Sequence, residues 1–161
     1  MERSRRVLAI ASAGGHWVQL RRMRPAWEGC AVVYASTEPG LAAMLAREAA
    51  EADRPAPPFH ALTDANRWQK LRLLRQMLEV LWLVLRLRPE VVVTTGASIG
   101  YFAVRAGRLV GARCIWVDSI ANVEELSLSG RKAGPHCTLW LTQWPELADE
   151  EAGPRYRGAV L

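Results

Sequence analysis

The chain has 161 residues, of which 50% are hydrophobic and 23% are charged. This length provides for one domain with a substantial core, and this composition excludes an intrinsically disordered chain. The net charge of +5 comes almost entirely from arginine and indicates an anionic partner, whether a nucleic acid, a phosphorylated substrate or an anionic lipid.

Short apolar runs alternate along the chain with segments of helical character. In chain order, we expect a strand at 7–11, a helix to about Trp27, a strand at 30–35, a helix at 41–52, a break at 54–58, a helix at 66–87, a strand at 91–95, a helix at 99–110, a strand at 113–118, a loop-helix region to Arg131 and a strand at 138–142. Continuous apolar strands that alternate with helices are typical of a parallel sheet buried on both faces. The sequence therefore predicts one doubly wound, Rossmann-like α/β domain over residues 1–161, with ligands at the carboxyl ends of its strands.

The chain shows no targeting or metal-binding pattern. Its first residues lack the apolar core of a secretory signal, and no run of about 18 uncharged apolar residues occurs, so we expect a cytosolic chain without a membrane span. The three cysteines, Cys30, Cys114 and Cys137, are too scattered for a disulfide framework or a zinc site. We therefore expect reduced thiols and no metal.

A glycine-rich loop follows directly after the first predicted strand. Gly14 and Gly15 allow a tight turn and a close approach of a ligand, and the helix that follows offers free N–H groups to an anion. His16 would lie at the mouth of the sheet, where a neutral imidazole can take a proton from an attacking hydroxyl. A tight turn with a capping histidine is the alternative. The loop is not a GxGxxG fingerprint, which disfavours a nicotinamide cofactor, and we expect no cofactor.

A second loop, after the predicted strand at 91–95, repeats the strand–glycine–helix arrangement. Gly96, Ala97 and Ser98 bring N–H and hydroxyl groups that could hold a phosphate or a sugar. Helix capping by Ser98 is the alternative explanation for this sequence.

A third polar segment follows the predicted strand at 113–118. Asp118 would orient or deprotonate a hydroxyl there, although a strand-end aspartate is also a common helix cap. The neighbouring candidates for substrate binding are Ser119, Asn122, Glu124 and Arg131. The guanidinium of Arg131 is suited to a diphosphate.

The predicted helix at 66–87 has more apolar surface than one sheet face can cover. At 100° per residue, its polar side chains and Leu83 share one narrow face; they are Arg72, Arg75, Gln76, Glu79 and Arg86. The apolar excess predicts contact with a membrane or a partner protein, and burial on several sides within the domain is the alternative. The residues expected at that contact are Leu74, Met77, Leu78, Leu81, Trp82 and Leu85.

Seven tryptophans would allow stacking on nucleic-acid bases. The sequence nevertheless has no basic–aromatic stripe and no helix-turn-helix, zinc-finger or RRM-type signature. A nucleic-acid partner is therefore disfavoured.

Six segments, taken in order, resemble a known family. They read Ser-Ala-Gly-Gly-His, Val-Val-Val-Thr-Thr-Gly-Ala, Ile-Trp-Val-Asp-Ser-Ile-Ala-Asn-Val-Glu, Leu-Ser-Leu-Ser-Gly-Arg, Leu-Thr-Gln-Trp-Pro-Glu-Leu and Tyr-Arg-Gly-Ala-Val-Leu. The family is the acceptor-side subunit of the split UDP-N-acetylglucosamine transferase of N-glycan precursor synthesis, with its bacterial exopolysaccharide and capsule counterparts. The similarity extends over essentially the whole chain.

The resemblance implies the N-terminal half of a GT-B glycosyltransferase, peripheral on the inner face of the cell membrane. This half would bind a polyprenyl-diphosphate-linked sugar, and a separate small subunit would bind the UDP-sugar. His16 matches a proposed base or acceptor-site residue in GT-B relatives. Where many bacterial members have Glu-Ser, this chain has Asp118-Ser119, so the reach of the carboxylate differs.

The predicted function is therefore inverting transfer of a sugar to a lipid-linked hydroxyl, with His16 or Asp118 as the base and activity only in the presence of the partner. The main alternative is a non-catalytic scaffold that recruits a catalytic partner to the membrane. A stand-alone nucleotide-binding protein is a third hypothesis. The sugar transferred, the linkage and the polysaccharide stay open.

Overall fold

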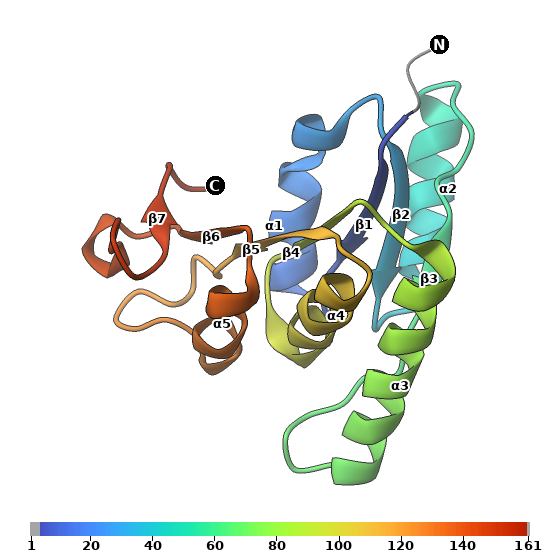
Figure 1. Cartoon of the computed structure of the whole chain (residues 1–161). Coiled ribbons are helices and arrows are strands. Elements are labelled where there is room, and N and C mark those ends of the chain that lie inside the picture. Colours follow the sequence, from blue (N-terminus) through green and yellow to red (C-terminus); the bar gives the residue numbers. More distant parts are fainter. Residues whose placement is uncertain (1–3, 161) are drawn as a thin grey trace.

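A computed structural model describes residues 4–160 of the chain (Figure 1). In this part of the chain seven strands form one parallel sheet in the order β3-β2-β1-β4-β5-β6-β7. The strands are β1 (Arg6–Ile10), β2 (Ala31–Ser36), β3 (Phe59–Ala61), β4 (Val91–Thr94), β5 (Arg113–Val117), β6 (Leu139–Thr142) and β7 (Arg155–Tyr156). The predicted Rossmann-like α/β fold is confirmed.

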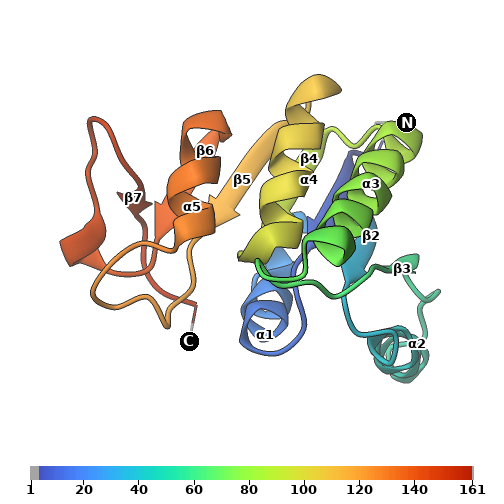
Figure 2. The same ribbon diagram turned by 90° about the horizontal axis from the view of Figure 1, so that it is seen from below.

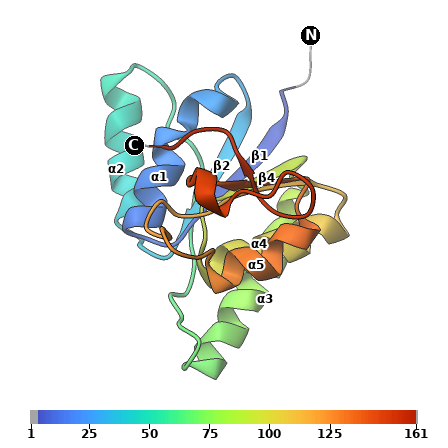
Figure 3. The ribbon, with the colours of Figure 1, turned by 90° about the vertical axis from the view of Figure 1, so that its left-hand side faces the viewer.

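Helices cover both faces of the sheet. They are α1 (Gly15–Arg22), α2 (Leu41–Glu51), α3 (Lys70–Leu87), α4 (Ala97–Leu109) and α5 (Leu128–Ala133), with short 3-10 turns η1 (Arg24–Trp27), η2 (Gly134–His136) and η3 (Pro145–Leu147). Helices α1 and α2 lie on one face, and α3, α4 and α5 lie on the other (Figures 2 and 3). None of the helices described has the length and hydropathy needed to cross a membrane.

Each central strand contributes side chains to two separate cores, because neighbouring residues of a strand point to opposite faces of the sheet. In β1, Leu8 and Ile10 join the cluster under α3 and α4, whereas Val7 and Ala9 join the cluster under α1 and α2. All four are almost completely buried. Continuous apolar strands are therefore required here.

The strand order reverses between β1 and β4, since the chain winds outward from β1 through β2 to β3 and then returns to β4 on the other side. Parallel α/β sheets bind ligands outside the carboxyl ends of the strands at such a switch point. The loops after β1 and β4 flank it. These are the two glycine-containing loops that the sequence singles out.

Helix α3 differs from its prediction in two respects. It begins at Lys70 instead of Asn66, because Asn66 accepts hydrogen bonds from the backbone N–H groups of Trp68 and Gln69 and holds a turn there. The expected polar face is also divided. Gln76 is only 1% exposed and points, with Leu83, toward the rest of the domain, while the arginines stay at the surface.

Candidate functional site at the switch point

Two hydrogen bonds join His16, in the first turn of α1, to Thr95, in the loop after β4. The Thr95 hydroxyl donates to the backbone carbonyl of His16 at 2.6 Å. In return, Nδ1 of His16 lies 2.8 Å from the carbonyl oxygen of Thr95. Residues 79 positions apart in the chain therefore hold one another at the carboxyl edge of the sheet.

The contact at Nδ1 decides where the imidazole proton lies. A carbonyl oxygen can only accept, so Nδ1 of His16 must donate and must carry the proton of the neutral ring. Nε2 is then the unprotonated nitrogen, and no hydrogen bond engages it among residues 4–160. A neutral imidazole with its second nitrogen oriented and free is the form that a general base requires.

Gly96 is the residue against which the His16 ring packs. A Cβ atom at Gly96 would lie 2.7 Å from Cε1 of His16, closer than non-bonded carbon atoms approach. The φ angle of Gly96 is +135°, which side chains rarely allow. This position therefore requires glycine both for its backbone and for the imidazole beside it.

The glycines before His16 leave open space. Gly14 has φ of +77° and ψ of −138°, and neither Gly14 nor Gly15 has a neighbouring atom where a Cβ would stand. Within the described part of the chain, no side chain caps the first turn of α1. Free N–H groups at a helix start attract anions, so a phosphate group can approach His16 from this side.

Ser98 lies in the first turn of α4 and is bonded away from His16. Its hydroxyl donates to Oε1 of Gln76 at 2.6 Å, and Nε2 of Gln76 donates to the Thr63 carbonyl at 2.7 Å. The capping alternative for Ser98 is wrong, since no side chain caps α4. Ser98 instead connects the site loop to α3 through a buried amide. Ala97, before it, has φ of +66°, an uncommon conformation for alanine.

Asp118 is placed very differently from His16. It is 1% exposed, and its carboxylate accepts from the backbone N–H of Ser127 at 2.8 Å and from the Ser127 hydroxyl at 2.6 Å. Nδ2 of Asn122 and Nε1 of Trp116 complete the set at 3.2 and 3.4 Å. Both oxygens are occupied by donors from the loop that follows β5. This arrangement suits a residue that orders the loop.

Ser119 belongs to a buried amide network that sequence analysis missed. Nε2 of Gln19 donates to its hydroxyl at 3.1 Å, and Oε1 of Gln19 accepts from the Ile120 N–H at 3.0 Å. Nε2 of Gln143 donates to Gln19 and to the Asp118 carbonyl, and Oε1 of Gln143 accepts from the Val160 N–H at 2.7 Å. The only signal in the sequence is that Gln19 lies three residues after His16, one helical turn along α1.

The remaining predicted binding residues lie at the surface. Arg131 is paired with Glu125 at 3.0 Å, and both side chains are well exposed. Glu124 is exposed as well. Asn122 is used to hold Asp118. The structure thus brings the first and second loops together tightly and leaves the tip of the third loop at the periphery.

Two of the three cysteines have thiols of low reactivity in this structure. Burial raises the pKa of Cys114 to about 11 and that of Cys137 to about 12, so both thiols stay protonated at neutral pH. All three cysteines are free in the structure. Within residues 4–160, no group of three or more His, Cys, Asp or Glu side chains could hold a metal ion.

An apolar stripe on α3 faces solvent next to the site. Of the six residues expected there, five are exposed and Leu81 is partly buried against the core; the exposed ones are Leu74, Met77, Leu78, Trp82 and Leu85. Trp68 and Leu71, at 78% and 84% exposure, extend the same surface and were missed. The amino-terminal half of α3 projects beyond the carboxyl edge of the sheet (Figures 1 and 3).

Arginines flank this α3 stripe. Arg67 stacks over Trp68 at 4.8 Å from the ring centroid, and Arg86 stacks over Trp82 at 5.4 Å. Arg75, also on this side, pairs with Glu79 at 2.8 Å. Apolar side chains bordered by cations match the interface of an anionic leaflet, where acyl chains lie beneath negative headgroups.

Comparison with known proteins places these features in context. Residues 69–160 match the family described as oligosaccharide biosynthesis protein Alg14 like. The UDP-N-acetylglucosamine transferase subunit ALG14 of Yarrowia lipolytica is 35% identical over 85 residues, which cover 49% of this chain and 39% of that relative. The corresponding subunit of Schizosaccharomyces pombe is 34% identical over 79 residues, 45% of this chain and 37% of that relative.

Among solved structures, MurG of Acinetobacter baumannii superposes with a TM-score of 0.69 at 14% identity, over 96% of this chain and 46% of MurG. The UDP-GlcNAc 2-epimerase of Methanocaldococcus jannaschii gives a TM-score of 0.58 at 11% identity, over 85% of this chain and 39% of the epimerase. The chain spans less than half the length of these relatives. At such identities the likeness establishes a shared fold, that of one lobe of a GT-B-type protein.

Proposed function

This chain belongs to the Alg14-like family of oligosaccharide biosynthesis proteins, and we propose that it is the acceptor-side subunit of a two-component inverting glycosyltransferase. The acceptor is a polyprenyl-diphosphate-linked sugar, and the UDP-sugar is brought by a separate donor-binding subunit. The observation that carries the proposal is the free Nε2 of His16, oriented by the Thr95 carbonyl at the switch point of the sheet.

In the proposed reaction, His16 acts as the general base. The acceptor hydroxyl attacks the anomeric carbon of the donor sugar, the bond from that carbon to the UDP oxygen breaks, and Nε2 of His16 takes the hydroxyl proton. One displacement of this kind inverts the anomeric centre. The carbonyl of Thr95 stabilises the imidazolium that forms, because Nδ1 donates to it throughout.

The proposed acceptor site uses backbone more than side chains. The open space beside Gly14 and Gly15, together with the uncapped start of α1, accommodates the diphosphate. Gly96 and Ala97 border the sugar, and Arg131 meets the anion from the edge. Ser98, Ser119 and Asn122 hold these groups in place through their hydrogen bonds. We assign Asp118 the same supporting role, because it is 1% exposed and both of its carboxylate oxygens already accept hydrogen bonds from Ser127.

We further propose that the α3 stripe binds the cytoplasmic leaflet of the cell membrane. A lipid-linked acceptor keeps its polyprenyl tail in the bilayer, so the site must lie close to the surface of the membrane. Ser98 bonds to Gln76 on the buried face of α3, so the helix that carries the stripe packs directly against the site. The exposed apolar side chains would enter the leaflet while Arg67 and Arg86 contact its headgroups.

The decisive experiment measures transfer of labelled sugar from a panel of UDP-sugars to a membrane lipid extract. It compares this chain, its small partner and the co-expressed pair. We expect sugar transfer only from the co-expressed pair. The pair that carries His16→Ala should lose this activity while the partner stays bound. Full activity of the partner alone would instead make this chain a membrane-recruiting scaffold, and activity of this chain alone would refute the requirement for two subunits.

A further inference from the structure

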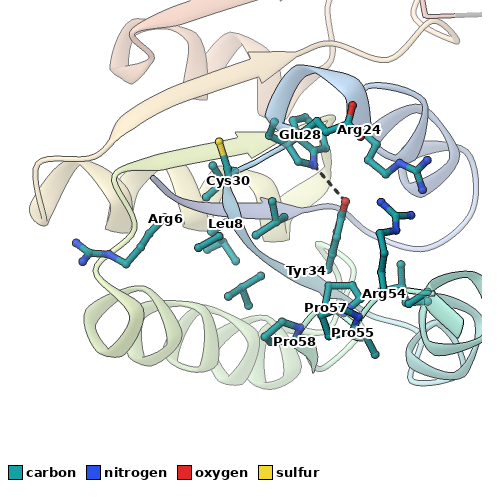
Figure 4. Close-up of a pocket in the computed structure, with 18 of the residues that line it drawn as sticks. Arg6, Leu8, Arg24, Glu28, Cys30, Tyr34, Arg54, Pro55, Pro57 and Pro58 are labelled. Atoms are coloured by element: carbon teal, nitrogen blue, oxygen red, sulfur yellow. Dashed lines mark hydrogen bonds between the residues drawn. The ribbon is translucent and has the colours of Figure 1, made fainter. Parts of the chain in front are cut away.

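A cavity of about 640 Å³ opens at the opposite edge of the sheet from His16 (Figure 4). Its walls come from the amino-terminal halves of β1 and β2, from η1, from the end of α2 and from residues 54–58. This volume is within the range of small-molecule sites, and most of the wall is aliphatic, as is usual for such sites.

The cavity exists because β3 is short. β3 pairs only with Tyr34–Ser36, so the outer edge of β2 has no partner strand over Ala31–Val33. The segment opposite contains Pro55, Pro57 and Pro58, and proline has no N–H to donate to a neighbouring strand. The last contact on this side is the bond from the Tyr34 N–H to the Pro58 carbonyl at 2.9 Å. On the amino-terminal side of this bond, β2 and residues 54–57 are no longer hydrogen-bonded to each other.

One buried hydroxyl in the wall has a proton to donate. Tyr34 is 3% exposed, and its hydroxyl oxygen accepts from Nε1 of Trp27 at 3.1 Å. The indole N–H is a donor only, so the hydroxyl proton of Tyr34 must be directed elsewhere, and no acceptor for it lies among residues 4–160. A ligand in the cavity with a negatively charged oxygen would supply that acceptor.

Two arginines lie at the same side of the cavity. Arg24 and Arg54 extend their guanidinium groups beside Tyr34 (Figure 4), and neither makes an ion pair or a hydrogen bond within the described part of the chain. The third arginine there, Arg21, is already paired with Glu48 and stacks over the Tyr34 ring. One further carboxylate, that of Glu28, also lines the cavity, and with Arg24 and Arg54 both present the charge left after the Arg21–Glu48 pair stays positive.

From these observations we propose that this cavity binds an amphipathic phosphate, with its aliphatic body along the apolar wall and its phosphate held by Arg24, Arg54 and the Tyr34 hydroxyl. Guanidinium groups bind phosphate through paired charge-assisted hydrogen bonds, which favours a phosphate over a neutral polar head. The site is independent of glycosyl transfer, because it lies at the other edge of the sheet. The ligand is either a lipid that leaves a membrane or a soluble phosphate ester.

The test uses decyl phosphate below its micelle concentration, with decanol and inorganic phosphate as the two half-ligands, in calorimetric titrations of the whole chain. We expect decyl phosphate to bind more tightly than either half-ligand. The Arg24→Gln/Arg54→Gln variant should lose at least tenfold in affinity, and Tyr34→Phe about threefold, the loss of one hydrogen bond. Arg22→Gln/Arg47→Gln removes the same charge from exposed positions outside the cavity and should change affinity less than twofold.

Two further variants separate the cavity from the α3 stripe and from misfolding. Leu78→Glu/Trp82→Glu should leave decyl phosphate binding unchanged, and circular dichroism should show all variants folded. Binding that survives the Arg24/Arg54 change, or that is lost in the Leu78/Trp82 variant, would overturn the proposal, as would no binding by the unmodified chain. Vesicles containing phosphatidic acid identify the source. If the unmodified chain extracts lipid from these vesicles and the Arg24/Arg54 variant extracts less, the ligand is a lipid. If the unmodified chain extracts no lipid but still binds decyl phosphate, the ligand is a soluble ester.

Discussion

The first turn of α1 and the loop after β5 each place a titratable side chain at the carboxyl edge of the sheet, His16 and Asp118, and the two side chains are held in opposite ways. In His16, Nδ1 donates to the Thr95 carbonyl and Nε2 has no hydrogen bond within the described part of the chain. Asp118 gives both oxygens to donors from residues 116, 122 and 127 and is buried beneath them. A general base needs one nitrogen or oxygen atom without a hydrogen bond, whereas a residue that orders a loop does so through the hydrogen bonds that its atoms accept.

The same comparison explains which parts of the site require a particular residue. The imidazole must be oriented but not covered, which accounts for Gly96 beside it. The carboxylate must be covered, which accounts for Ser127 both bonding to Asp118 and capping α5 by accepting from the Gly130 N–H at 2.9 Å. The division between a catalytic loop and a supporting loop is open to direct tests.

The largest effect is expected from His16→Ala. Removal of a general base typically costs about 10²–10⁴-fold in rate, so turnover by the assembled pair should fall by roughly a thousandfold. Partner binding should change little, and the unfolding free energy should fall by about 1 kcal/mol, because the Thr95 carbonyl loses its bond from Nδ1. Turnover is measured with saturating acceptor and donor. A variant that keeps more than a tenth of normal turnover would remove His16 from the chemistry.

Asp118→Ala tests the other side of the comparison. It leaves the N–H and hydroxyl of Ser127 without a buried acceptor, so the free energy of unfolding should fall by about 3 kcal/mol in urea titrations. Turnover should fall with the loss of order in the loop, but the acidic limb of the pH–rate profile should stay in place. A shift of that limb would show that Asp118 takes part in proton transfer.

Gly96→Ala should disturb the imidazole without removing it. The new Cβ would lie 2.7 Å from Cε1 of His16, so the ring must turn away from the Thr95 carbonyl. The rotated imidazole would no longer point Nε2 at the acceptor hydroxyl. We therefore expect turnover to fall roughly thirtyfold with a smaller change in acceptor KM. The matched control is Gly111→Ala, which has φ of +76° and no neighbouring atom. It introduces backbone strain alone and should leave turnover near normal.

The α3 stripe extends the comparison from chemistry to location. Leu78→Glu/Trp82→Glu should weaken binding to anionic vesicles at least tenfold in flotation assays, because two charges would replace apolar side chains in the leaflet. Turnover on a detergent-dispersed, short-chain acceptor should be unaffected. Leu109→Glu/Val123→Glu alters two exposed apolar residues outside α3 and serves as the control. Equal losses in both double variants would show that α3 has no special role.

Sequence patterns predicted the central strands and helices well, because a buried parallel strand must be continuously apolar and β1, β4 and β5 are. They missed β3 and β7, which have three and two residues and no apolar run of their own. They pointed to His16 as a candidate because two glycines after a strand favour a close approach of a ligand.

What the patterns could not supply is the partner of each polar side chain. Gln19 and Gln143 meet across 124 positions of the chain, and nothing local to either residue predicts the contact. Asp118 was placed correctly at a strand end, yet the direction of its carboxylate depends on the path of residues 119–127, which only the folded chain determines. The secondary-structure element of each polar residue and its place at a strand end could be predicted from the sequence. Whether its side chain is free or hydrogen-bonded depends on the tertiary structure.

The smallest effect concerns Glu79, whose carboxylate holds Thr63 in the loop between β3 and α3. Burial raises its pKa, but hydrogen bonds from the Thr63 N–H, from Arg75 and from the Thr63 hydroxyl outweigh that effect and leave the pKa below its usual value of 4.5. A lowered carboxyl pKa stabilises the folded state above pH 4.5 and loses that contribution as the pH falls through the lowered pKa. Glu79→Gln should therefore reduce the unfolding free energy by about 1 kcal/mol or less at pH 7, and the difference from the unmodified chain should shrink by pH 3. Urea titrations at both pH values measure this, and a difference that stays constant would mean that Glu79 contributes by packing instead of by charge.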